Sequence, residues 1–200
     1  MVFRELQHSN RKFYSSIRKW WNFWCWYRKK YIDKNFLLEI PNELPFIFLP
    51  LQQEPERSLL ISAPNYVNQL DTVEYVSKCI PEDYFLFVKE HPTQGSGREW
   101  RKISDYQAMQ NNPKVKLIHP SVPANEIIAK SKLVISVSGT LALESAFFNK
   151  PSITFADNDY TLIPSISRLK SKNDDFLIEV ASESNSSSLR PVGDSHSITY

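Results

Sequence analysis

A short run of small polar residues at positions 136–140, Ser-Val-Ser-Gly-Thr, could bind a phosphate group. It follows an apolar run and opens an expected helix, so its backbone N–H groups would lie at the positive end of the helix dipole. Gly139 would let a phosphate approach the backbone closely, and Ser138 and Thr140 would add hydroxyl donors. Glu144, one helical turn further on, could bind ribose hydroxyls. The alternative is that these residues only cap a helix.

A second candidate is the tetrapeptide Lys-Glu-His-Pro at positions 89–92. His91 could donate a hydrogen bond to a phosphate oxygen, and Pro92 would stiffen its turn. Lys89 and Glu90 could contact the same ligand or pair with each other in solvent. His119, which also precedes a proline, is an additional candidate. Both histidines could equally be ordinary turn residues.

Alternating apolar and amphipathic segments must position these candidates. We expect strands at 46–51, 84–88, 115–119, 133–137 and 152–156, and helices at 67–80, 98–109, 123–130 and 140–149. Such alternation with short connections predicts an α/β fold, a Rossmann-like and mainly parallel sheet flanked by helices. Ligands bind at the carboxyl ends of the strands in such a sheet, and each candidate follows a strand directly.

The first 34 residues form a basic and aromatic segment. They contain nine lysines or arginines and two acidic residues, a net charge of +7, whereas the rest of the chain carries −5. Spacings of three and four predict one amphipathic helix with a stripe of Phe13, Ile17, Trp20, Trp24, Tyr27 and Tyr31. The segment could contact the inner-membrane surface, since Trp and Tyr favour the interface and cations favour anionic lipids. Alternatively, the stripe packs against a domain.

These patterns divide the chain into three parts. Residues 1–44 are expected to form the basic aromatic helix and a linker, and residues 45–170 the Rossmann-like domain that binds the ligand. Residues 171–200 are expected to form a polar and partly disordered tail, because 182–188 are almost entirely Ser, Asn and Glu.

Several classes of protein are disfavoured by what the sequence contains. It has four glycines and neither a GxGxxG nor a Walker A motif, which argues against a dehydrogenase or P-loop enzyme. Neither the two cysteines nor any Asp, Glu or His group has metal-ligand spacing, so we expect no metal and no cofactor. A net charge of +2 without a recognition motif argues against a nucleic-acid partner. Without a signal peptide or long apolar run, we expect a cytoplasmic protein, with peripheral inner-membrane contact at most.

Three stretches of the sequence resemble the capsule-polysaccharide synthesis family, whose characterised members include Kdo transferases. They are LPLQQEPERS at 49–58 followed by NQL at 68–70, VKEHP at 88–92, and LVISVSGTLALESA at 133–146 followed by KPSI at 150–153. The likeness covers about residues 45–169. The stretches occur in order and at compatible spacing, which makes the combination more specific than any one of them.

The resemblance implies a GT-B glycosyltransferase architecture, with this chain supplying the C-terminal, donor-binding half. In related enzymes that transfer Kdo or sialic acid, a His-Pro motif and a serine motif hold the donor nucleotide. His91 with Pro92 matches the first motif, and Ser136 with Ser138 matches the second. Glu144 matches an acidic position of the following helix. The donor implied is a nucleotide sugar, CMP-linked in preference, and the acceptor a lipid-linked sugar or a polysaccharide.

The chain also departs from that architecture. A complete GT-B enzyme has an N-terminal domain that supplies the acceptor site and a catalytic acid or base, and only about 44 residues precede the first expected strand here. We therefore assign no catalytic residue and expect a fragment or one part of a split enzyme. Two hypotheses remain open: a donor-binding glycosyltransferase domain of surface polysaccharide synthesis, and a non-catalytic module that depends on a partner.

Overall fold

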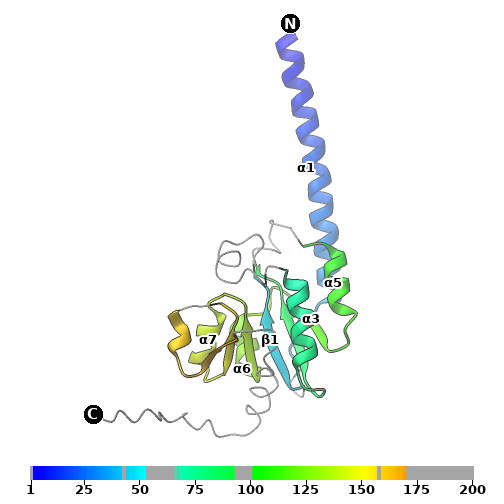
Figure 1. Cartoon of the computed structure of the whole chain (residues 1–200). Helices are drawn as coiled ribbons and strands as arrows, with labels where there is room; N and C mark the ends of the chain where they lie inside the picture. Colours follow the sequence, from blue (N-terminus) through cyan, green and yellow to red (C-terminus); the bar gives the residue numbers. More distant parts are fainter. Residues whose placement is uncertain are drawn as a thin grey trace, which may run out of the picture.

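A parallel sheet is the centre of the computed structural model, which describes residues 2–41, 44–52, 66, 68–92, 101–156 and 159–169 (Figure 1). Its six strands lie in the order β3-β2-β1-β4-β5-β6. The strands are β1 Phe46–Pro50, β2 Phe85–Lys89, β3 Val115–Ile118, β4 Leu133–Ser136, β5 Ser152–Thr154 and β6 Ile166–Arg168. Phe48 of β1 pairs with Phe87 on one side and Val134 on the other, so the strand order reverses at β1.

Helices cover both faces of the sheet, which explains why the central strands are almost wholly apolar. Helices α3 (Gln69–Cys79) and α5 (Ile103–Gln110) contribute Val76 and Met109 to the core on one face. Helix α6 (Ala124–Lys130) contributes Ile127 and Ile128 to the opposite core, where Leu141 of helix α7 (Leu141–Phe147) also packs. The predicted α/β fold with a mainly parallel sheet is confirmed.

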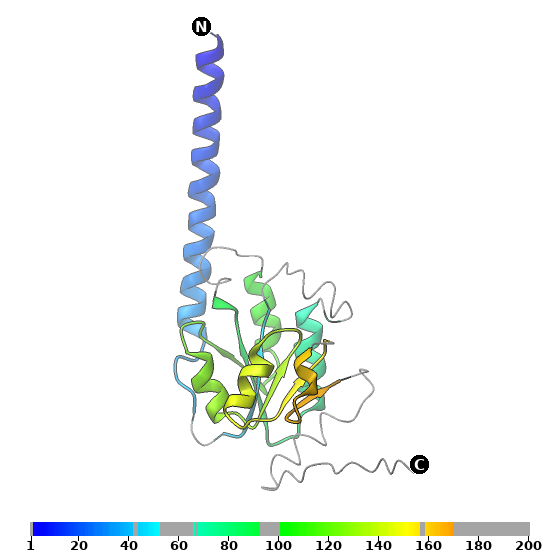
Figure 2. The same ribbon diagram turned by 90° about the vertical axis from the view of Figure 1, so that its left-hand side faces the viewer.

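Helix α1 (Val2–Asn35) projects away from the sheet as a long rod (Figure 2). Its side chains are described from Ser16 onward. Only the C-terminal turns join the domain: Ile32 and the following Phe36 are buried in the core. Leu37 then forms a parallel bridge with Ile118 of β3, and this places the base of α1 at the carboxyl edge of the sheet. Among the described helices, none is long and apolar enough to cross a membrane.

Element boundaries differ from the predictions at several ends. Helix α3 begins two residues later than expected because the Asn68 side chain caps it, accepting a hydrogen bond from the Leu70 N–H at 3.1 Å. Strand β6 and a short 3-10 helix, η2 (Asp159–Leu162), were not predicted. Two predictions lie partly or wholly outside the described residues. They are the first three residues, 98–100, of the helix expected at 98–109, and the polar tail expected at 171–200.

Candidate functional site

The carboxyl edge between β1 and β4 is the natural ligand position in this fold. The sheet order reverses there, and in folds of this kind ligands bind above the strand ends where the crossover connections diverge. Gln52 follows β1 on one side, and the turn 136–140 follows β4 on the other. The structure therefore brings the predicted serine motif to the edge where a ligand is expected.

Hydrogen bonds within the turn 136–140 fix its shape. The Ser136 hydroxyl accepts a hydrogen bond from the Gly139 N–H at 3.0 Å and donates to the Gly139 carbonyl at 3.1 Å. The Tyr160 hydroxyl also donates to that carbonyl, at 3.0 Å. Thr140 donates to the carboxylate of Glu144 at 3.1 Å, so these two predicted site residues contact each other.

The Gln52 side chain packs closely against Gly139 at this edge of the sheet. A Cβ atom added at Gly139 would lie 2.7 Å from Nε2 of Gln52 and 3.2 Å from the Ser136 hydroxyl. The backbone of Gln52 is itself held by the buried Gln69, which accepts from its N–H at 2.6 Å and donates to its carbonyl at 3.0 Å. A larger residue at position 139 would therefore require the end of the Gln52 side chain to move.

Ser138 places a hydroxyl in the turn that none of the described residues satisfies. Its Oγ is inaccessible to solvent and has no hydrogen-bond partner among the described residues. An unsatisfied buried hydroxyl is unfavourable by about 1–3 kcal/mol, and such groups in native proteins often mark a ligand position.

Lys89 ends strand β2 and is 6% exposed. Burial lowers the pKa of its ammonium group. Side chains alternate along a strand, so Lys89 shares a face with Phe87, and Ser136 shares that same face with Val134. Across β1 the two lie about 10 Å apart. Within the described ranges no carboxylate pairs with Lys89, and this cation could therefore meet an anionic ligand.

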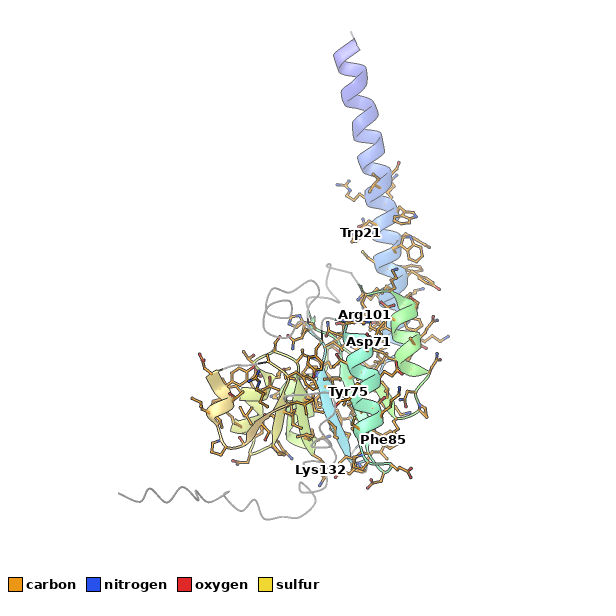
Figure 3. All side chains as sticks on the ribbon, in the orientation of Figure 1. Trp21, Asp71, Tyr75, Phe85, Arg101 and Lys132 are labelled. Carbon is orange, nitrogen blue, oxygen red and sulfur yellow. The ribbon has the colours of Figure 1, made fainter. Side chains whose placement is uncertain are left out.

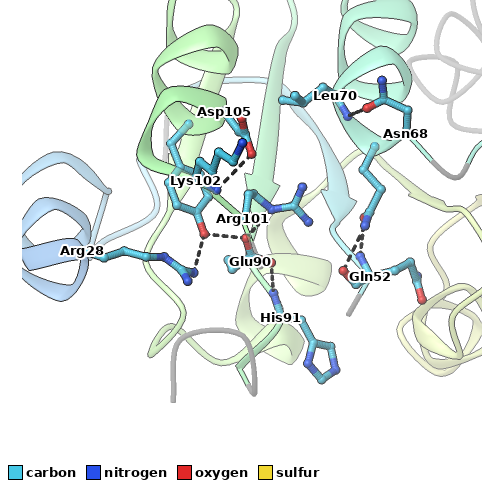
Figure 4. A network of polar contacts seen from close by, with 11 residues as sticks. Arg28, Gln52, Asn68, Leu70, Glu90, His91, Arg101, Lys102 and Asp105 are labelled. Atoms are coloured by element: carbon cyan, nitrogen blue, oxygen red, sulfur yellow. Dashed lines mark hydrogen bonds and ion pairs between the residues drawn. The ribbon is translucent and has the colours of Figure 1, made fainter. Parts of the chain in front are cut away.

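Glu90 is the centre of a buried polar network and does not pair with Lys89 (Figure 4). Its Oε2 accepts hydrogen bonds from Arg101 Nε and from the Tyr106 hydroxyl, each at 2.7 Å. Its Oε1 accepts from the His91 N–H at 2.9 Å. Arg28 of α1 joins through a 2.9 Å hydrogen bond to the Tyr106 hydroxyl. Glu90 thus supports the His91 turn from inside the domain.

The remaining candidates occupy different positions. The His91 imidazole points away from the Glu90 carboxylate, toward the outside of the network (Figure 4), and Pro92 is exposed. His119 follows β3, and β2 and β1 separate it from the turn after β4. Its Nε2 lies 3.1 Å from Asp33 Oδ1 and its Nδ1 2.6 Å from the Ser121 hydroxyl, so it ties α1 to the sheet.

Sequence reasoning did not assign three residues that contact this edge of the sheet: Gln52, Gln69 and Tyr160. Gln52 and Gln69 stand inside the stretches 49–58 and 68–70 that carry the family resemblance, which is a usable signal. Tyr160 lies in a segment whose role depends on tertiary contacts. In the part of the chain that the structure describes, no group of three or more His, Cys, Asp or Glu side chains is arranged to hold a metal ion.

Comparison with solved structures supports the architecture. The chain is similar to the KpsC β-Kdo 2,7-transferase of Thermosulfurimonas dismutans, with a TM-score of 0.52 and 13% identity, covering 82% of this chain and 52% of that one. It is also similar to the UDP-GlcNAc 2-epimerase of Methanocaldococcus jannaschii, with a TM-score of 0.50 and 16% identity, covering 77% and 41%. The shared feature is the fold of one Rossmann-like half of a GT-B protein.

Sequence comparison identifies the family. Protein FixF of Sinorhizobium fredii is 25% identical over 120 residues, which cover 58% of this chain and 28% of that protein. The chain thus spans about half or less of the length of the relatives it matches. The family model described as capsule polysaccharide biosynthesis protein matches residues 5–168. The chain therefore belongs to the capsule polysaccharide biosynthesis family.

Proposed function

We propose that this chain is the donor-binding half of a glycosyltransferase that builds a bacterial surface polysaccharide. The nucleotide sugar binds at the carboxyl edge between β1 and β4, with its phosphate beside Ser138 and Gly139. The unsatisfied Ser138 hydroxyl is the observation that carries the proposal, because a ligand oxygen would supply its missing partner. Lys89, on the same face of the sheet, provides positive charge for the phosphate.

The other predicted residues have secondary parts in this proposal. His91 donates to the nucleotide from the turn that Glu90 supports, with Pro92 stiffening that turn. Ser136 maintains the shape of the phosphate turn, and Glu144, already contacted by Thr140, accepts from ribose hydroxyls. Stabilisation of the departing nucleotide phosphate by these groups would be the contribution of this half to transfer.

A CMP-linked sugar such as Kdo is the donor we favour. The support is the likeness in fold to a structure named as a β-Kdo transferase and the order of the His-Pro and serine motifs. Isothermal titration of the chain with CMP, CDP and UDP tests both the site and this preference. Tighter binding of CMP is expected, and absence of binding to all three nucleotides would overturn the proposal.

The site itself is tested by Ser138→Ala. Losing one neutral hydrogen bond should weaken CMP binding by about twofold to tenfold. Ser104→Ala is the matched control, because Ser104 is exposed on α5, beside the far strand of the sheet. Equal affinities of the Ser138→Ala variant and the unchanged chain would remove Ser138 from the site.

A second candidate function is that the chain binds a nucleotide sugar but transfers the sugar only when a partner protein is present. Under this candidate, a second polypeptide supplies what corresponds to the part of the two similar structures that this chain does not cover, since it spans 52% and 41% of them. Release of the nucleotide from a CMP-sugar, followed with a lipid-linked or polysaccharide acceptor, separates the candidates. Turnover by this chain alone supports the first, whereas nucleotide binding without turnover supports the second.

We also propose that α1 contacts the inner-membrane surface. Between Ile17 and Tyr27 it exposes seven large apolar side chains: Ile17, Trp20, Trp21, Phe23, Trp24, Trp26 and Tyr27. This band is wider than the single stripe expected from the sequence, and the described part of α1 carries six cations against one acid. Aromatic rings at the interface and cations on anionic lipids would hold such a helix at a membrane.

Flotation of the chain with lipid vesicles tests the membrane contact. Binding is expected to vesicles that contain phosphatidylglycerol and to weaken with added salt, because screening reduces the attraction between cations and the anionic surface. Failure to float with any vesicle would overturn the contact and would leave the nucleotide proposal untouched. In that case α1 packs against a protein domain.

A further inference from the structure

A pocket opens where α1 meets the start of α5. Its volume is about 430 Å³, and its lining comes from one side of α1 and from the residues that begin α5. The lining residues are Trp20, Trp21, Trp24, Arg28, Arg101, Lys102 and Ile103. Figure 3 shows Trp21 on the rod of α1 and Arg101 at the adjoining end of α5. The pocket is distinct from the proposed nucleotide site at the carboxyl ends of β1 and β4.

The lining combines aromatic rings with positive charge. Of the seven described residues that line the pocket, three are tryptophans, three are cations and none is acidic. Trp20 and Trp24 meet edge to face with their ring centroids 5.8 Å apart, which forms a wall of two indoles. Indoles prefer the boundary between the lipid headgroups and the acyl chains, whereas a guanidinium or ammonium prefers phosphate.

Two of the cations are held rigidly at the base of the pocket. Arg101 is 4% exposed and its Nε donates to Glu90 at 2.7 Å. Arg28 is 5% exposed and donates to Tyr106. Lys102, by contrast, is exposed beside them. Because Arg28 and Arg101 are held in place, an anion that enters the pocket would not have to order these two side chains.

We propose that this pocket binds the phosphate-bearing headgroup of a single anionic membrane lipid. The proposal rests on the proposed membrane contact of α1 and adds a defined site to it. The phosphate would lie toward Arg28, Arg101 and Lys102, and the glycerol and first acyl carbons along Trp20, Trp21 and Trp24. A volume of about 430 Å³ is within the range of sites for small ligands.

Charge distribution points to a lipid in preference to an uncharged sugar. The tryptophans that line the pocket are themselves 62%, 47% and 46% exposed, so the opening is continuous with the aromatic band of α1. A lipid held in a membrane that this band touches would reach the pocket directly. The three cations of the lining outnumber the one Glu90 carboxylate that pairs with Arg101, and a neutral ligand would not offset the remaining positive charge.

Binding of a lipid monomer separates this pocket from a general surface contact. The probe is dihexanoyl phosphatidic acid below its micelle concentration, titrated against the full chain while tryptophan fluorescence is recorded. Saturable binding of one lipid per chain is expected. Dihexanoyl phosphatidylcholine, which has no net negative charge, should bind at least about tenfold more weakly because a charge-assisted contact is lost. Inorganic phosphate should be weaker by at least about the same factor because it has no acyl chains to contact the tryptophans. Absence of saturation, or equal binding of inorganic phosphate, would overturn the site.

Two tryptophan variants provide the matched comparison. Trp21→Ala removes a wall of the pocket, whereas Trp26→Ala removes a ring of similar exposure on the same helix that does not line it. Monomer binding should be lost in the first variant and retained in the second, while both should float less well with vesicles. Equal losses of monomer binding would contradict the pocket. Vesicle flotation failing while monomer binding persists would overturn only the membrane contact.

Discussion

The hydroxyl of Tyr106 donates a hydrogen bond to Oε2 of Glu90 at 2.7 Å, deep inside the domain. Burial first, and then the negative charge of Glu90, raise the pKa of Tyr106, so the phenol stays protonated and keeps donating. The Tyr106 hydroxyl oxygen accepts a hydrogen bond from Arg28 of α1, and Oε1 of Glu90 accepts one from the His91 N–H. A continuous chain of hydrogen bonds therefore joins the base of α1 to a turn of the proposed donor site.

Replacing Tyr106 with phenylalanine should destabilise the domain by about 1–3 kcal/mol. The change removes the shared hydroxyl and leaves buried donors and acceptors on Arg28 and Glu90, while the ring can keep its edge-to-face contact with Phe36. Urea unfolding measures the effect. Tyr31→Phe is the matched control, since its hydroxyl donates to Gln110 at a half-buried position and should matter less. Equal effects of the two changes would contradict the network.

Glu90→Gln should lower the free energy of unfolding by about 3–5 kcal/mol, because it leaves Arg101 buried without its opposite charge. This effect is larger than the one expected for Tyr106→Phe. Both side chains of this ion pair are almost fully buried, at 0% and 2% exposure. Adding Arg101→Met should recover part of the loss, and a double-mutant cycle from urea unfolding measures that coupling. Glu74→Gln, in the exposed pair with Lys78, should leave the unfolding midpoint nearly unchanged. Additive effects at 90 and 101 would refute the prediction.

The sheet could be predicted from sequence because its strands are short apolar runs separated by amphipathic helices. Tyr84 to Val88 and Leu133 to Val137 are almost continuously apolar, as strands covered on both faces must be. Strand β6 was not predicted because only one of its three residues, Ile-Ser-Arg, has an apolar side chain. It forms a strand through its pairing with β5. Local pattern does not encode such pairing.

The candidate site was predictable only in part for a similar reason. The turn 136–140 can be predicted from its small residues between a strand and a helix. The pairing of Glu90 with Arg101, and not with the adjacent Lys89, depends on how α5 packs on the sheet. The clamp of Gln69 on Gln52 joins residues 17 positions apart and has no local signature. Long-range polar contacts of this kind are set by tertiary structure.

Lys89→Met should lower nucleotide affinity while leaving the fold as stable or more stable. The ammonium is desolvated, which is unfavourable until an anion binds, and methionine fills similar space without charge. Loss of a hydrogen bond between charged groups predicts affinity for CMP weaker by on the order of tenfold to a hundredfold. Titration calorimetry and thermal unfolding of the same samples provide the two measurements. Lys78→Met, at an exposed position, is the control.

The pH dependence follows from the same burial. The pKa of Lys89 is lower in the folded chain than in the unfolded one, so between the two values the unfolded state binds more protons. Stability contributed at this residue should therefore rise as pH increases through that window, and CMP affinity should fall as the ammonium loses its proton. Both slopes should be smaller in the Lys89→Met variant. Identical pH profiles of the variant and the unchanged chain would contradict the assignment of Lys89.

Gly139→Ala should weaken both the fold and nucleotide binding, and the role of Gln52 can be isolated by a second change. The added methyl group would lie 2.7 Å from the Gln52 amide, whose backbone Gln69 holds in place, so the Gln52 side chain must swing aside. Overpacking of this kind typically destabilises by about 1–3 kcal/mol. In a Gln52→Ala background the same substitution should destabilise much less, because the clashing amide is gone. Urea unfolding of the four proteins gives the coupling.

CMP affinity in the same four proteins then separates steric from ligand effects. If Gly139 is needed because the phosphate approaches its backbone, the methyl group should weaken CMP binding in both backgrounds. Full recovery of affinity in the Gln52→Ala, Gly139→Ala double variant would instead mean that the loss came from the displaced Gln52 side chain. The phosphate would then have to bind elsewhere on the turn, and Gly139 would be required for packing alone.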